Sequence, residues 1–212
     1  MQPPQSDDCA WQASVVQLLY LTVESSDAAS TYLSSGAFDH HERTAMPNTT
    51  AEKELFLQLW EREFATTLKV LRAYPTGKDD FKPAEKSNTA KNLVWTLVIE
   101  QHIALGMVSG GVDFSRGMPS APTGSVADLI PILEKAHADA FSKVKESSNE
   151  ALDGQTTFPS GPGQMGQFRI MDLLWTPLLD MIHHRGQLSV YLRMVGAKVP
   201  SIYGPTADEP WM

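Results

Sequence analysis

Two residues near the C-terminal end of the chain, Asp180 and His184, have the types and spacing for chemistry. They lie in the stretch DMIHHRGQL, residues 180–188. Side chains four residues apart on a helix project side by side. A carboxylate and an imidazole in that arrangement can clamp a metal ion, because histidine is the commonest metal ligand. They can also form a structural hydrogen bond with each other, and the spacing alone leaves both interpretations open.

A metal site would need a further ligand from another helix, and His102 is the candidate. It lies in WTLVIEQHIAL, where Trp95, Val98 and Leu105 recur around it at helical spacing. A histidine on such an apolar face needs a partner, because a buried polar group without one is costly. The partner could be a metal ion, or simply a backbone carbonyl in the core.

The other polar residues near these positions fit a site less well. His137 has charged neighbours, so we expect it on a solvated face, and His40 and His41 lie in the polar stretch FDHHERT before the core, so we do not expect them to be ligands. Glu100 is about half a turn away from the face of His102 and is also expected to be solvated. His183 is rotated by about 100° from His184, which indicates a surface or supporting position.

Four long segments have helical periodicity, and almost nothing is typical of a strand. They span roughly residues 51–74, 88–109, 125–147 and 167–196. Ser87 or Asn88 can cap the second segment, and Ser125 with Asp128 resembles a capping box for the third. We therefore predict an all-α protein, a four-helix bundle whose site is built from inward-facing side chains.

The connections and the N-terminal part complete this organisation. The Gly- and Pro-rich stretch 153–166 and the link 110–124 are predicted to be loops. Residues 1–48 hold one expected helix around 10–34, so we predict an N-terminal extension that is helical and packs on the core. Residues 49–212 then form the bundle with a C-terminal tail.

The last helix carries a stripe that is apolar at both ends and polar in the middle. The residues at three- and four-residue spacing are Leu173, Pro177, Asp180, His184, Gln187, Leu188, Tyr191 and Val195. Residues at this spacing share one face of a helix, and that face should point into the bundle. Pro177 lacks the N–H for the Leu173 carbonyl and should bend the helix.

Composition narrows the classes of function. The chain has 212 residues and a formal net charge of -8, which argues against general binding to nucleic-acid phosphates. No apolar run approaches the length of a membrane span, and VVQLLYL (15–21) follows acidic residues, unlike a signal peptide. The single cysteine, Cys9, excludes an internal disulfide and a thiolate metal cluster, and it favours a cytoplasmic location.

The segment HRGQLSVYLRMVG (184–196) resembles the C-terminal signature of the DinB/YfiT-like superfamily of proposed metal-dependent enzymes. The order of elements is similar over roughly residues 50–197, including the KPAEKSN linker (82–88) and the Ser-Val-Ala-Asp-Leu start of the third helix. This resemblance implies a four-helix bundle with three metal ligands, typically all histidine.

Transferred residue by residue, the resemblance implies His102, Asp180 and His184 as the metal ligands. Asp180 stands where the family usually has histidine, so the set would contain two histidines and one carboxylate. Such a set suits zinc or nickel, with iron as an alternative. Arg185 and Gln187 are interpreted as supporting residues, with Arg185 holding an acidic partner between helices.

The resemblance also implies a class of activity. It favours a metal-dependent enzyme, either a thiol-dependent S-transferase or a hydrolase. The substrate would be a small molecule, and a low-molecular-weight thiol is a candidate cosubstrate. Tyr191, about two turns beyond His184, could donate a proton. The alternative is a non-catalytic metal- or ligand-binding, stress-related protein. The resemblance also implies that the chain can form a homodimer, and either function is compatible with one.

Overall fold

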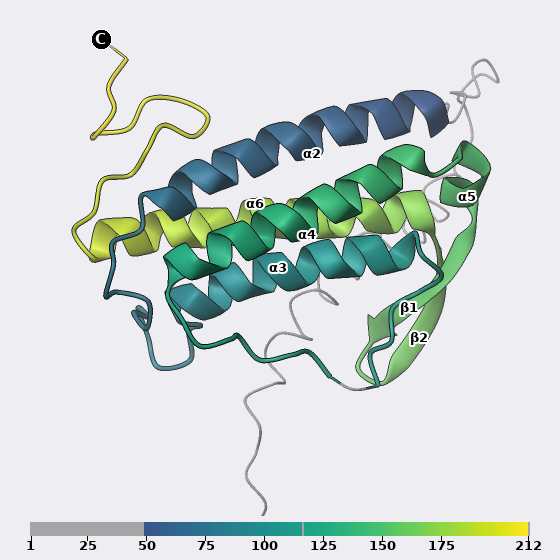
Figure 1. Cartoon of the computed structure of the whole chain (residues 1–212), viewed down its shortest axis with the longest axis horizontal. Helices are drawn as coiled ribbons and strands as arrows, with labels where there is room; N and C mark the ends of the chain where they lie inside the picture. The colour runs from purple at the N-terminus through teal and green to yellow at the C-terminus, as the bar shows by residue number, and fades with distance from the viewer. Residues whose placement is uncertain (1–48, 116, 212) are drawn as a thin grey trace, which may run out of the picture.

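The computed structural model describes residues 49–115 and 117–211, and its main body is a bundle of four long helices (Figure 1). The helices are α2 (Thr49–Arg72), α3 (Ala90–Met107), α4 (Val126–Glu146) and α6 (Ile170–Met194). Contacts link α2 to α4, α4 to α3, α3 to α6 and α6 to α2. The predicted all-α four-helix bundle is confirmed. The expected extension 1–48, with its helix around 10–34, lies outside the described residues.

The helices run in two directions. In Figure 1, α2 and α6 point one way, and α3 and α4 point the other way. Because the neighbours α3 and α4 are parallel, the link 108–125 has to return along the bundle before α4 begins. The link 110–124 was predicted to be a loop, and its described residues, 110–115 and 117–124, contain neither helix nor strand.

Local signals define the helix ends. Ser125 and Asp128 form the predicted capping box at the start of α4, each side chain accepting from the other residue's backbone N–H. The cap of α3 is Thr89, whose hydroxyl accepts from the Asn92 N–H, and not Ser87 or Asn88. Gly196, with a φ of 78°, follows the end of α6, where a left-handed residue suits glycine.

The stretch 153–166 is not a plain loop, so that prediction was wrong. After the short helix α5 (Asn149–Asp153), strands β1 (Gln155–Gly161) and β2 (Gln164–Arg169) pair antiparallel as a hairpin. Gly163, with a φ of 68°, occupies the turn. Glycine and proline dominated the sequence pattern here, but a two-stranded ribbon has only edge strands, which tolerate proline.

The predicted stripe on α6 faces inward. Leu173, Pro177, Asp180, His184, Leu188 and Tyr191 are buried, and Gln187 and Val195 are half-buried. The helix continues through Pro177, as α4 does through Pro131. None of the described helices is long and apolar enough to cross a membrane.

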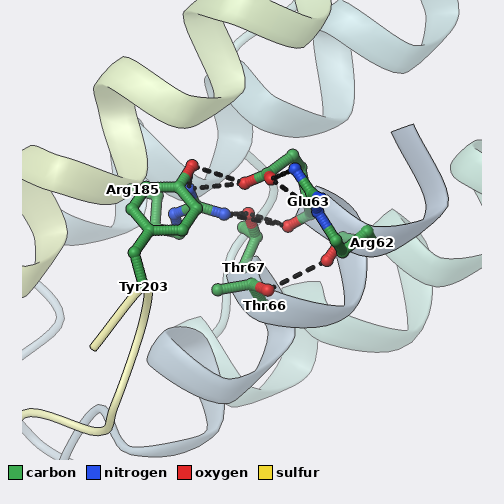
Figure 2. Close-up of polar contacts among 6 residues, drawn as sticks. All are labelled: Arg62, Glu63, Thr66, Thr67, Arg185 and Tyr203. Atoms are coloured by element: carbon green, nitrogen blue, oxygen red, sulfur yellow. Dashed lines mark hydrogen bonds and ion pairs between the residues drawn. The ribbon is translucent and has the colours of Figure 1, made fainter. Parts of the chain in front are cut away.

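A buried ion pair joins α6 to α2. The Arg185 guanidinium donates to the Glu63 carboxylate at 2.7 Å and to the Glu63 backbone carbonyl at 3.0 Å (Figure 2). Arg185 is 1% exposed and Glu63 is 3% exposed. The expectation that Arg185 holds an acidic partner between helices is confirmed.

The C-terminal tail completes this pair. Figure 2 shows the Tyr203 side chain reaching from the tail to both charged groups. Its hydroxyl donates to Glu63 Oε2 at 2.6 Å and accepts from Arg185, whose guanidinium also lies 5.0 Å from the ring centroid. Burial would raise the pKa of Glu63, but hydrogen bonds from Tyr203, Arg185 and Arg62 outweigh it and hold that pKa below its usual value.

We expect Arg185→Leu to lower the free energy of unfolding by about 3–5 kcal/mol, because it leaves the Glu63 carboxylate buried without its main partner. The matched control is Arg62→Leu, since Arg62 pairs with the same carboxylate at 3.1 Å while its side chain stays 67% exposed. That variant should cost less than about 1 kcal/mol. Urea unfolding followed by circular dichroism measures both, and equal losses would contradict the assignment.

Candidate metal centre

Three side chains from two helices converge between α3 and α6: Glu100, Asp180 and His184. Each can offer one ligand atom so that all three atoms lie within 4.8 Å of one another. His184 Nε2 lies 3.5 Å from Glu100 Oε1 and 3.5 Å from Asp180 Oδ1. Asp180 and His184 come from the predicted stripe on α6, one turn apart. The group is called the acidic–histidine cluster below.

The cluster is buried and its polar atoms are unsatisfied. Glu100 and Asp180 are each 2% exposed, and His184 is 5% exposed. Both oxygens of Glu100, both oxygens of Asp180 and Nε2 of His184 have no hydrogen-bond partner among the described residues. Orphaned buried acceptors are expensive, and charged ones more so. A cation could contact one such atom from each of the three residues, because these three atoms lie within 4.8 Å of one another.

Protonation in the cluster reflects the crowding of negative charge. Burial and the neighbouring Asp180 carboxylate raise the pKa of Glu100 well above its usual range. Burial would also raise the pKa of Asp180, but His184 outweighs it and holds that pKa below its usual value. Burial would lower the pKa of His184, and Asp180 reverses this, so that pKa is raised. Without a cation, Glu100 and His184 therefore retain their protons to higher pH than the same groups do in solvent.

The predicted ligand His102 does not lie in the cluster. Its side chain is exposed on the outer face of α3, and its Nδ1 lies 2.9 Å from the carbonyl oxygen of Val98 on the preceding turn. The structure thus brings together two of the three predicted residues, Asp180 and His184, and leaves His102 apart from them.

Glu100 was expected in solvent, and that expectation was wrong. Most residues of α3 are buried, on nearly every side of the helix. The side chain of Glu100, half a turn from His102, therefore points into the bundle and not into solvent. A signal for this was present in the sequence. Lys91 lies eleven residues, or about three turns, before His102, so the two residues share one face of the helix. A lysine favours solvent, which indicates that this face, with His102 on it, points outward.

His137 was also expected in solvent and is 6% exposed. Its ring stacks on Phe64, with centroids 3.6 Å apart and planes at 8°, and its Nδ1 lies 3.1 Å from Gln101 Oε1. His183, expected at the surface, is exposed. Tyr191 uses its hydroxyl to donate to the Asn88 carbonyl at 3.0 Å, so it is engaged at the start of α3.

A cavity of about 150 Å³ lies beside the hairpin, away from the cluster. Met107, Leu152, Thr156 and Ile170 are among its lining residues, and no member of the cluster is. Met107 is seven residues beyond Glu100, about 10 Å along the helix axis. Within the described part of the chain, this cavity therefore gives no direct access to the cluster.

A family model described as the DinB family matches residues 46–211, well over half of the chain. The chain belongs to the DinB family. This confirms the resemblance seen in the segment 184–196 and explains why the bundle and its inward-facing stripe follow the expected order.

Known proteins similar to this chain agree with the family assignment. The uncharacterized protein YrdA of Bacillus subtilis (strain 168) is 26% identical over 160 residues, covering 73% of this chain and 89% of YrdA. A solved DinB-like protein from Bacillus cereus has a TM-score of 0.59 at 23% identity, covering 71% of this chain and 97% of its own. The DinB-like protein YjoA from Bacillus subtilis has a TM-score of 0.56 at 18% identity, with coverages of 74% and 99%. At these identities the two solved structures support the shared fold.

His137 should make stability depend on pH. Burial lowers its pKa to about 4 from 6.5, so between these values the unfolded chain binds a proton that the folded chain does not. The stabilisation is complete above about pH 6.5 and is lost as pH falls toward 4, by roughly 2–3 kcal/mol. Urea unfolding at neutral and acidic pH should show this loss in the wild type and less of it in His137→Gln. An unaltered slope in His137→Gln would refute the assignment.

Proposed function

We propose that this DinB-family protein binds a divalent metal ion through Glu100, Asp180 and His184. The observation that carries the proposal is a set of five buried oxygen and nitrogen atoms of the cluster without a hydrogen-bond partner among the described residues, together with the convergence of one ligand atom from each residue to within 4.8 Å. Burying two carboxylates beside an imidazole costs several kcal/mol unless a positive charge compensates them. A divalent cation supplies that charge and accepts both carboxylate and imidazole ligands.

The donor set contains two carboxylates and one imidazole. Zinc, iron and nickel accept imidazole, and the second carboxylate makes the site harder than the predicted two-histidine set, which extends the candidates to manganese. Metal binding requires deprotonated ligands, so it must displace the protons that Glu100 and His184 retain. The affinity should therefore fall as pH is lowered.

Metal content should separate the cluster from His102. We expect the purified wild-type protein, supplied with zinc, nickel, iron or manganese and then desalted, to keep about one ion per chain. Glu100→Gln and Asp180→Asn should lose it, because each removes a charged ligand while nearly preserving shape. His102→Gln should retain it, since that side chain lies outside the cluster. Elemental mass spectrometry measures all four proteins.

The alternative outcomes are distinct. Loss of the metal in His102→Gln with retention in Glu100→Gln would favour the ligand set that the family resemblance implies. A wild-type protein that retains none of the four metals would refute metal binding, and the cluster would then be a protonated structural group. Unfolding curves of each variant establish that loss of metal is not loss of fold.

For activity, we propose a metal-dependent enzyme of the thiol-dependent S-transferase or hydrolase type. Three protein ligands leave coordination positions free, as in catalytic metal sites. When bound, such an ion polarises a substrate oxygen or lowers the pKa of a bound water or thiol. The chain's own residues would hold the ion through Glu100, Asp180 and His184 and exclude bulk water around it. A low-molecular-weight thiol fits this class as cosubstrate.

The second candidate is a non-catalytic metal-binding protein. It is favoured by the burial of the cluster and by the position of the hairpin cavity, whose lining includes none of the three residues. A metal ion that serves only to compensate buried charge needs no route for a substrate.

Access to the ion distinguishes these two candidates. Manganese bound at the cluster should enhance the relaxation of bulk water protons if exchangeable water reaches the ion, and added small thiols should then reduce the enhancement. The Asp180→Asn variant is the control for manganese bound elsewhere. Enhancement that thiols reduce favours the enzyme, whereas a bound ion without enhancement favours the non-catalytic protein.

A further inference from the structure

The side chain of Gln187 connects two histidines on α6. Its Oε1 lies 2.9 Å from Nδ1 of His184, and its Nε2 lies 3.2 Å from Nε2 of His183. His183 is exposed, Gln187 is half-buried and His184 is buried. The amide therefore bridges a histidine at the surface and the histidine of the cluster.

The two ends of an amide are not equivalent. The oxygen only accepts and the nitrogen only donates hydrogen bonds. With its oxygen toward His184, Gln187 requires a proton on Nδ1 of that ring. The neutral ring then presents a lone pair on Nε2 to Glu100 and Asp180, which is the form that binds a metal.

The reverse orientation would abolish this form. If the Gln187 nitrogen faced His184, Nδ1 would have to accept and the proton would move to Nε2. His183 opposes that reversal, because its Nε2 accepts from the amide nitrogen in the orientation present. Metal-ligating histidines commonly have such a partner on the second ring nitrogen.

We propose that Gln187 and His183 are positioning residues for the metal ligand His184, with Gln187 selecting its tautomer and His183 selecting the orientation of the Gln187 amide. This inference rests on the proposed function, because the selected tautomer matters for ligation. It assigns a role to His183, which lies outside the cluster and points to solvent.

Zinc affinity in a double-mutant cycle tests the proposal on the full chain. Gln187→Met removes both hydrogen bonds at similar size, and zinc binding should weaken 10- to 100-fold. Gln187→Glu should keep the affinity, because a carboxylate accepts from Nδ1 with either oxygen. His183→Phe should weaken zinc binding by a smaller factor in the wild-type background.

The combination of variants is the decisive comparison. In the Gln187→Glu background, His183→Phe should have no effect on zinc affinity, since a carboxylate has no wrong orientation. A purely structural role for His183 predicts the same loss in both backgrounds and would overturn the proposal. His102→Phe, at an exposed histidine of α3, is the control for loss of a surface imidazole.

The tautomer can be read without any metal. Nitrogen-15 spectra of the metal-free protein at alkaline pH should show the His184 proton on Nδ1 in the wild type and on Nε2 in a larger fraction of Gln187→Met. A wild-type His184 that carries its proton on Nε2 overturns the proposal. If the wild type shows the Nδ1 proton and binds no zinc, the metal function fails while the positioning stands. If it binds zinc with unchanged affinity in Gln187→Met, the positioning fails while the metal function stands.

Discussion

Glu100 and Asp180 bring two carboxylates into the interior between α3 and α6, where each would cost several kcal/mol as an unpaired ion. His184 can compensate only one negative charge, and only while it is protonated. The result is an arrangement with raised pKa values for Glu100 and His184 and with five acceptor or ligand atoms left without partners among the described residues. A divalent cation would compensate this excess of negative charge, so the electrostatics of the cluster are compatible with metal binding.

The cluster is part of a polar belt around the bundle. Arg185, next to His184, pairs with Glu63 on α2, and Gln101, next to Glu100, contacts His137 on α4. The members of the belt, in order around the four helices, are Glu63, Arg185, His184, Glu100, Gln101 and His137, and the ring of His137 then stacks on Phe64 of α2, next to Glu63. Contacts of the belt therefore link each of the four helices to its neighbours at the level of the acidic–histidine cluster.

Prediction from the sequence succeeded where the residues of a single segment carried the information. The stripe on α6 and the capping box at Ser125 and Asp128 follow from periodicity and local chemistry, and the structure confirms them. The acidic partner of Arg185 was inferred from the motif that contains Arg185, and the structure confirms it as well. It failed for Glu100 and His137, which were both expected in solvent. Their helices pack on more than one side, so a polar residue away from the main apolar stripe meets another helix and not water.

By itself the sequence predicted the all-α bundle and the side-by-side position of Asp180 and His184, because these depend on spacing along the chain, and the segment 184–196 indicated the family by its resemblance. The tertiary structure alone decided that α3 contributes Glu100 and turns His102 outward. The physical reason is that the hydrophobic pattern of α3 is nearly uniform around its axis, so its rotation is set by contacts with α4 and α6. The orientation of the Gln187 amide is likewise a tertiary property, because it depends on which atoms the two histidines present.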